Sequence, residues 1–271
     1  MLAEKLSGGA APAVIYVDDV FSTWLYTGNS STQTITNGIN LSAYGGLVWG
    51  KSRSGAYNHE LVDTARGAGN ALRSNQTAAS TTSCDVNSFT TTGFTLNSAG
   101  GGEINTNTVT EVAWTFRKAA KFFDVVTYTG TGVARTVSHS LGSTPGCIIV
   151  KCTTTGATNW RVYHNGLTSS AYTIQLDQTN AQSNQTSIWN STAPTASSFT
   201  VGTDPSVNSL GDQYVAYIFA HNAGGFGLTG TDNVISCGSF ISSGGVDTIN
   251  LGYEPQWVLY KCATNLSDWR I

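Results

Sequence analysis

Two short motifs place an indole ring beside a guanidinium group. The chain reads Asn-Trp-Arg at 159–161 and Asp-Trp-Arg at 268–270. An exposed indole face can stack on the C–H face of a sugar ring while neighbouring donors bond the sugar hydroxyl groups. Four residues are therefore candidate ligand-binding residues: Trp160, Arg161, Trp269 and Arg270. The competing interpretation is that both indoles lie in the core at the start of a strand, because tryptophan is mostly buried in folded proteins.

Three lysines recur at one position of three similar stretches of sequence. Lys51, Lys151 and Lys261 each lie near the end of an apolar run. The same residue type at the same position three times makes them further candidates for ligand contacts. The alternative is a core strand in which the lysine stem covers apolar surface and the ammonium group emerges at the rim.

Catalytic and metal-binding patterns are not found in the sequence. The four histidines stand apart, without the His-Glu-x-x-His spacing of zinc hydrolases, and no Gly-x-Ser-x-Gly marks a serine nucleophile. The acidic residues mostly stand beside Gly, Ser or Asn, where turn formation explains them. The five cysteines form no ligand set and are expected to be buried free thiols. We predict no catalytic residue, no metal site and no cofactor, so the chain is not expected to be an enzyme.

An internal repeat must position the candidate residues. The stretch 21–53 is similar to 122–154, and both are similar to 234–264, with the three lysines in register. A spacing of roughly 100 residues is too long for a solenoid repeat and matches the size of one small domain. The repeat therefore predicts domains strung in series.

The repeat also sets the expected boundaries. We expect four parts: an N-terminal arm at 1–13, a first unit at 14–120, a second unit at 121–223 and a partial third unit at 224–271. The first two units end in similar strands, Val-Ala-Trp at 112–114 and Val-Ala-Tyr at 215–217. The third unit shows no such strand, so we expect that residues after 271 or another chain complete it.

Local patterns indicate strands almost throughout. The run 146–152 is rich in β-branched residues, and 213–220 alternates two apolar sets, as expected for a strand covered on both faces. The best helical candidate, 60–72, is interrupted by two glycines. Shorter strands are expected at 13–21, 172–176, 198–201 and 248–251. With turn residues at short intervals, these patterns favour an all-β fold of tandem β-sandwich domains, jelly-roll or lectin-like, the last one incomplete. Three further tryptophans lie in apolar runs and are expected in the core: Trp49, Trp114 and Trp257.

The composition limits the class of protein. Charged residues make up 11% of the 271 residues and the net charge is −3, against about 25% charged residues in typical soluble domains. No Lys/Arg cluster is present to neutralise phosphates, which argues against nucleic-acid binding. No apolar run reaches the roughly 18 residues needed to cross a bilayer, so membrane insertion is not expected. A neutral surface of Thr, Ser, Asn and Gly is typical of extracellular and viral β-proteins, and we expect a component of a virus particle.

Two stretches have distinctive patterns: Lys-Phe-Phe-Asp-Val-Val-Thr-Tyr-Thr-Gly-Thr-Gly at 121–132 and the spaced pattern Val-Lys…Asn-Trp-Arg-Val-Tyr-His at 150–164. Both resemble repeat domains found in structural and tail-fibre-like proteins of marine bacteriophages. The similarity extends from about residue 14 to the end. The resemblance implies a lectin-like β-sandwich in a virion appendage, and it implies no catalytic residues.

These observations together predict a function in attachment. We expect a bacteriophage tail or fibre component that contributes to host-surface attachment and binds surface glycan. Fibres commonly have three chains, so a homotrimer is expected, joined to other virion proteins through the arm at 1–13. One alternative is a capsid-associated decoration protein. Another is a polysaccharide-degrading tail enzyme, for which no carboxylate pair can be named.

Overall fold

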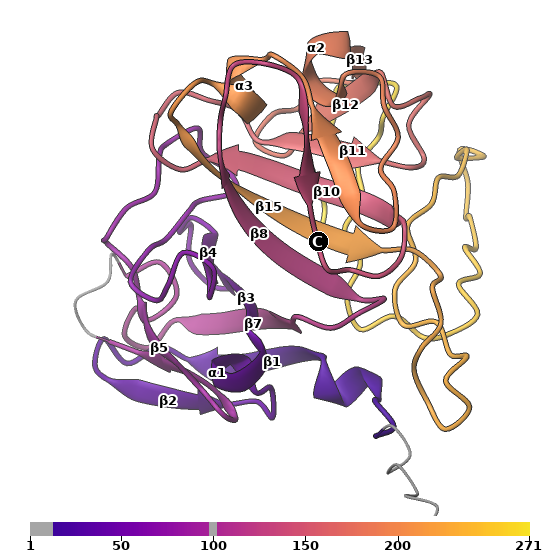
Figure 1. Cartoon of the computed structure of the whole chain (residues 1–271). Coiled ribbons are helices and arrows are strands. Elements are labelled where there is room, and N and C mark those ends of the chain that lie inside the picture. The colour runs from indigo at the N-terminus through magenta and orange to yellow at the C-terminus, as the bar shows by residue number, and fades with distance from the viewer. Residues whose placement is uncertain (1–12, 98–101) are drawn as a thin grey trace, which may run out of the picture.

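Antiparallel β-sheets make up most of the protein. The computed structural model describes residues 13–97 and 102–271 (Figure 1). The predicted N-terminal arm therefore lies outside this part, except for residue 13. Strands account for 35% and helices for 6% of the structure, which confirms the prediction of an all-β fold. The helices of the described residues are single turns: η1 (Val17–Asp19), α1 (Leu41–Tyr44), α2 (Thr186–Trp189) and α3 (Pro205–Asn208).

The N-terminal half forms two sheets that share a core. One has the strand order β1-β7-β3-β4 and the other the order β2-β6-β5. Their apolar side chains meet in one buried cluster, with Val48 and Ala113 from the larger sheet and Ile35 and Phe94 from the smaller. The strands are β1 (Phe21–Thr27), β2 (Gln33–Thr36), β3 (Gly46–Ser52), β4 (Glu60–Asp63), β5 (Val86–Thr90), β6 (Gly93–Leu96) and β7 (Thr110–Arg117).

Residues 123–220 form a second pair of sheets. The larger has the order β13-β12-β11-β10-β15-β8 and the smaller joins β14 to β9. Ile148 and Ile218 of the larger sheet and Val137 and Phe199 of the smaller belong to one buried cluster. The strands are β8 (Phe123–Thr129), β9 (Arg135–Ser138), β10 (Pro145–Cys152), β11 (Arg161–His164), β12 (Tyr172–Gln175), β13 (Ser183–Asn184), β14 (Ser198–Val201) and β15 (Gln213–Ala220).

The two pairs of sheets repeat the same strand order. The sequence β1-β7-β3-β4 in the first recurs as β8-β15-β10-β11 in the second. The register also recurs, because the pair Gly50–Ala113 in the first corresponds to Val150–Ala216 in the second. The similarity of the two stretches of sequence thus has a counterpart in backbone pairing. Below, the two pairs of sheets are called the first and second units.

A third apolar cluster, called the central cluster below, lies between the two large sheets. It includes Trp49 from β3, Trp160, and Tyr217 and Phe219 from β15. The alternate residue Ala216 belongs instead to the inner core of the second unit. The prediction that 213–220 is a strand covered on both faces is therefore confirmed, and the reason is that β15 separates two cores.

Three local predictions are wrong. The first strand begins at Phe21 rather than at residue 13, because residues 17–19 form η1, where the Asp19 carboxylate accepts the N–H of Tyr16 at 2.8 Å. The helical candidate at 60–72 begins with the strand β4, which pairs with β3. Residues 248–251 form no strand. For 60–72 and 248–251 the outcome depends on a partner strand, which the first has in β3 and the second lacks, and this outweighs the local pattern.

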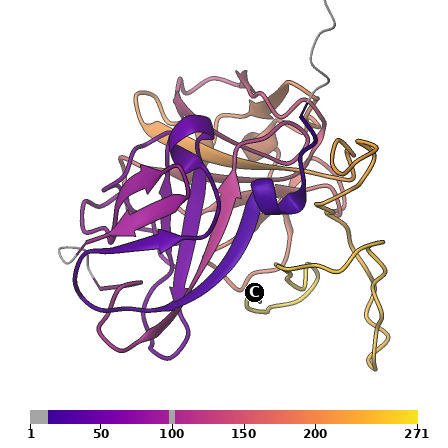
Figure 2. The same cartoon turned by 90° about the horizontal axis from the view of Figure 1, so that it is seen from below.

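The C-terminal segment, residues 224–271, is extended but belongs to no named strand. Figure 2 shows it, in orange to yellow, as a long trace beside the sheets. Trp257, Leu259 and Trp269 nevertheless pack against the central cluster. The segment is thus held to the body of the protein by these side chains and by backbone hydrogen bonds such as that from Gln182 to Ala263.

Candidate functional site

The buried lysine of β10 does not reach the rim of its sheet. Lys151 is 0% exposed, and its Nζ donates to the carbonyl of Thr77 at 3.1 Å and to the carbonyl and hydroxyl of Thr158 at 2.9 and 2.8 Å. Burial lowers the pKa of Lys151 from 10.5 to about 8. The expectation of an ammonium group at the rim is therefore wrong for Lys151, because the loop that carries Thr77 covers it.

The first tryptophan–arginine pair is also buried. Trp160 is 0% exposed, and its Nε1 donates to the carbonyls of Arg73 and Gln76, both at 3.1 Å. Its ring stacks on Tyr217 with centroids 6.3 Å apart. Arg161 is buried as well and its Nε donates to the Ser206 hydroxyl at 2.8 Å. The exposed platform considered for 159–161 is thus not present, and Trp160 is a core residue.

The second tryptophan–arginine pair, Trp269 and Arg270, is more exposed than the first. Trp269 is partly buried, and its Nε1 donates to the carbonyl of Gln175 at 2.7 Å, while Arg270 is exposed. Lys261 lies over the Trp269 ring, with Nζ 6.0 Å from the centroid, and also donates to the carbonyl of Ser267. One face of this indole is therefore covered by a cation from its own segment.

An open groove of about 770 Å³ gathers three of the predicted residues. It lies where β3, β7 and the C-terminal segment meet, and its lining includes Lys51, Trp269 and Arg270. It does not include Lys151, Trp160, Arg161 or Lys261. Among the other lining residues, which the sequence analysis did not identify as ligand contacts, four are aromatic or cationic: Trp49, Arg53, His59 and Trp114.

Aromatic rings form one wall of the groove. The rings of Trp49 and Trp114 meet edge to face, with centroids 6.3 Å apart. Trp49 is buried as predicted, whereas Trp257 and Trp114 pack against the central cluster and are only partly buried. The reason lies in the repeat, since Trp114 and His59 stand where the second unit has Tyr217 and Trp160. The smaller imidazole leaves open the space that an indole fills in the second unit.

The groove carries both positive and neutral donors. His59 accepts the indole N–H of Trp49 at its Nδ1, 3.0 Å away. Burial, and then the charge of Lys51, lowers the pKa of His59 to about 4, so the ring is neutral at pH 7. Lys51 and Arg53 add cationic donors at the edge of the aromatic wall. Such a lining suits a polyhydroxylated ligand, because rings cover C–H faces and donors meet hydroxyl or acidic oxygens.

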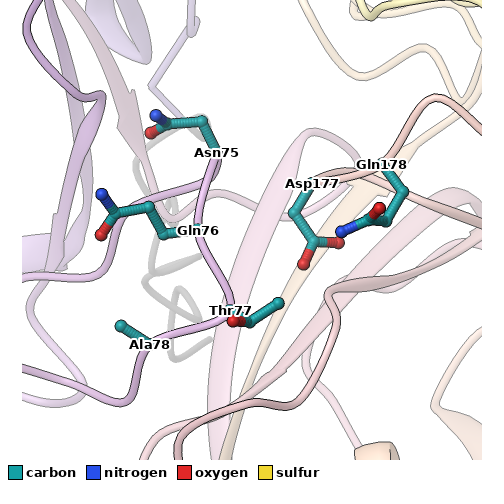
Figure 3. A pocket seen from close by; sticks show the side chains of 6 residues that line it. All are labelled: Asn75, Gln76, Thr77, Ala78, Asp177 and Gln178. Carbon is teal, nitrogen blue, oxygen red and sulfur yellow. The ribbon is translucent and has the colours of Figure 1, made fainter.

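A second, smaller pocket of about 410 Å³ lies nearby between two loops. Figure 3 shows the Asp177 carboxylate and the Thr77 side chain turned toward each other, while the amides of Asn75 and Gln76 point away. The Asp177 carboxylate accepts from the side chain of Asn159 and from the backbone N–H of Trp160, both at 3.1 Å. Asp177 therefore joins two loops of the second unit, and burial raises its pKa.

Two of the buried carboxyl groups of the first unit have strongly raised pKa values and lie outside both pockets. Glu60 accepts the backbone N–H of Asp85 at 2.9 Å, and burial raises its pKa to about 8. Burial, and then Asp85, raises the pKa of Glu111 to about 8 as well. Both side chains are thus protonated at neutral pH, which avoids burying a charge among apolar residues.

Cysteines and metal ligands complete the inventory of reactive groups. Three cysteines are buried, Cys147 is partly buried and Cys262 is exposed, so the expectation of buried thiols is wrong for Cys262. Across residues 13–97 and 102–271, no group of three or more His, Cys, Asp or Glu residues could hold a metal ion. Within the same ranges no helix is long and apolar enough to cross a membrane.

Comparison with known proteins gives one match. The family model described as "Domain of unknown function (DUF7483)" matches residues 17–271. No curated protein and no solved structure matches the chain.

Proposed function

We propose that this chain, which belongs to the DUF7483 family, is a structural and adhesion component of a bacteriophage tail or fibre. Its units serve as a scaffold, and the groove at Trp114 binds glycan of the host surface. The observation that carries the proposal is the groove itself, in which the partly exposed Trp114 and Trp269 stand beside the cationic Lys51 and Arg53. The resemblance of 121–132 and 150–164 to repeat domains of marine bacteriophage proteins supports a place in the virion.

The scaffold is proposed to consist of tandem β-sandwiches of jelly-roll or lectin-like type. The recurring strand order and the separate inner core of each unit support this description. Residues 224–271 follow as a third, partial unit. Since a large sheet of each unit faces the central cluster, the units form a rigid support for the groove between them.

Binding is favoured over polysaccharide cleavage by the positions of the acidic groups. Glycoside hydrolysis needs an acid that can reach the leaving oxygen. Asp177 and Asp268 line the groove, and the carboxylate of Asp177 is held by Asn159 and by the backbone of Trp160. The two carboxyl groups with the highest pKa values, Glu60 and Glu111, do not line it. A reducing-end assay with host capsule polysaccharide is expected to show no release of sugar.

Titration with purified host-surface polysaccharide tests the binding role. Trp114→Ala is expected to weaken binding by about fivefold, since loss of ring stacking costs on the order of 1 kcal/mol and each 1.4 kcal/mol is tenfold. The matched control is Trp24→Ala, which removes an exposed indole from β1 outside the groove. Equal binding by the wild type and both variants contradicts glycan binding at the groove.

Imaging of labelled protein on phage particles tests the virion role. A tail or fibre position is expected. A position on the head favours the capsid-decoration alternative, and absence from particles contradicts both.

A further inference from the structure

The repeated lysine has different surroundings in the first and second units. Lys51 and Lys151 lie at matching places in β3 and β10. The Nζ of Lys151 donates to three acceptors, the carbonyl of Thr77 and the carbonyl and hydroxyl of Thr158. The Nζ of Lys51 donates to one, the carbonyl of Ser52 at 2.8 Å. Since an ammonium group has three donors, two donors of Lys51 have no acceptor in the described part of the protein.

A second cation stands two residues after Lys51. The N–H of Arg53 donates to the carbonyl of Thr110 at 2.8 Å, so the pairing of β3 with β7 continues to Arg53. Alternate residues of a strand share a face and lie roughly 7 Å apart. Trp49, Lys51 and Arg53 therefore form one row, and all three line the groove. Arg53 is exposed, and its guanidinium group has no hydrogen-bond partner within residues 13–97 and 102–271.

Neither cation of this row is paired with a carboxylate. Over the residues that the structure describes, the ion pairs join other side chains: Arg66 with Asp63, Arg73 with Glu103 and Lys118 with Asp124. Lys51 and Arg53 therefore keep their positive charges available to a ligand.

The carboxyl groups around the groove do not cancel these two charges. Asp177 and Asp268 line it, but the lysines whose charged form they favour belong to the second unit and to the C-terminal segment. Glu111 lies near Lys51, but burial raises its pKa to about 8, so its side chain is protonated at neutral pH. The wall formed by β3 is thus locally cationic in a chain whose net charge is −3.

The same face of the second unit is built for packing instead. Thr153 stands where the first unit has Arg53, because the N–H of Thr153 donates to the carbonyl of Gln213 in the same way. Ile149 and Trp160 of this face are buried in the central cluster. The first unit therefore differs from the second at the positions that decide whether this face is packed or open and charged.

We propose that the glycan bound at the groove is an acidic polysaccharide, whose carboxylate or sulfate oxygens accept hydrogen bonds from Lys51 and Arg53 while Trp114 stacks on a sugar ring. This ligand class rests on the proposed glycan-binding function of the groove. A guanidinium group can hold two anionic oxygens at once, and an ammonium group binds one as a point charge. All three residues belong to the first unit.

Titration calorimetry of the full chain with two matched pairs of polysaccharides tests the proposal. One pair is polygalacturonate and its carboxyl-reduced product, and the other is dextran sulfate and dextran. In at least one pair the charged member is expected to bind at least tenfold more tightly than the neutral one, and that pair identifies the acidic group. The difference should shrink between about 0.1 and 1 M salt, since the screening length falls from about 10 to about 3 Å.

Two variants connect this preference to the named side chains. Arg53→Gln and Lys51→Met are each expected to weaken binding of the charged member by about fivefold and to leave binding of the neutral member unchanged. The matched control is Lys121→Gln, which removes an exposed cation outside the groove and should have no effect. Arg53 is exposed and without a partner, so Arg53→Gln is expected to fold like the wild type, which thermal unfolding checks.

Four outcomes overturn the proposal. They are equal affinities within both pairs, no binding of any of the four polysaccharides, equal binding by the wild type and both groove variants, and tighter binding of a thymidine oligonucleotide. The last would assign the rings and cations to single-stranded nucleic acid. Equal affinities that Trp114→Ala lowers would overturn the acidic class and leave glycan binding standing, so the two failures are distinguishable.

Discussion

The indole Nε1 of Trp160 lies 3.1 Å from the carbonyl oxygen of Arg73 and donates to it. Arg73 belongs to the first unit and Trp160 to the second, so one side chain joins the two. Its ring lies in the central cluster, stacked on Tyr217. Trp160, which the sequence analysis considered as a platform for a sugar ring, is therefore a structural link between the repeats.

Replacement of Trp160 by alanine is expected to destabilise the protein. Removal of a fully buried indole leaves a cavity and costs roughly 3–5 kcal/mol in such cases. Chemical denaturation followed by circular dichroism measures the loss. Trp24→Ala, on an exposed part of β1, should change the free energy of unfolding by no more than about 0.5 kcal/mol. A Trp160→Ala protein as stable as this control contradicts the core role.

The contribution of Glu60 and Glu111 to stability is expected to fall as the pH rises from about 4.5 to about 8. In the unfolded chain Glu60 and Glu111 lose their protons near pH 4.5, whereas the native state keeps them until about pH 8. The unfolded state then binds fewer protons over this interval, so the free energy of unfolding decreases with pH. Denaturation midpoints measured at several pH values check the slope. Glu111→Gln should remove part of this contribution, and a variant whose pH dependence equals that of the wild type would count against the assignment.

Lys151 is expected to give the opposite slope at higher pH. Its native pKa is about 8 and its unfolded pKa 10.5, so the unfolded state binds more protons between these values. The contribution of Lys151 to the free energy of unfolding therefore rises with pH over this interval. Comparison of wild type with Lys151→Met by the same denaturation series isolates this contribution. Identical slopes for the two proteins contradict it. Lys118→Met, which alters a partly exposed lysine paired with Asp124, is the control.

One thiol is expected to react rapidly with a thiol reagent in the native protein. Cys262 is exposed, and hydrogen bonds from Thr264 lower its pKa, while burial raises the pKa of Cys84 and Cys147. Titration with a chromogenic disulfide should show one fast group, lost in Cys262→Ser. An unchanged fast phase in that variant contradicts the assignment.

Several features of the fold follow from the sequence alone. The alternation of 213–220 between two apolar sets predicts a doubly covered strand, and β15 is one. The three lysines in register predict equivalent strands, and Lys51 and Lys151 do lie at matching places in β3 and β10. Such patterns are readable because side chains alternate across a strand and each face meets one environment.

The exposure of the candidate residues could not be read in the same way. Trp160 and Trp269 have similar neighbours in sequence, yet one is fully buried and the other lines a groove. Trp160 is covered by the loop that carries Arg73 and Gln76, more than 80 positions away. Trp114 forms part of an open wall because His59, on another strand, is smaller than the indole at its equivalent position.

The amino-acid sequence by itself thus determined the strand-rich class, the repeat and the register of its anchor residues, since these depend on local period and composition. The tertiary structure decided which lysine is buried, which indole faces the groove and which cations stand beside it. Those outcomes depend on how the faces of one repeat pack against loops of another, and contacts between distant segments leave no local pattern in the chain.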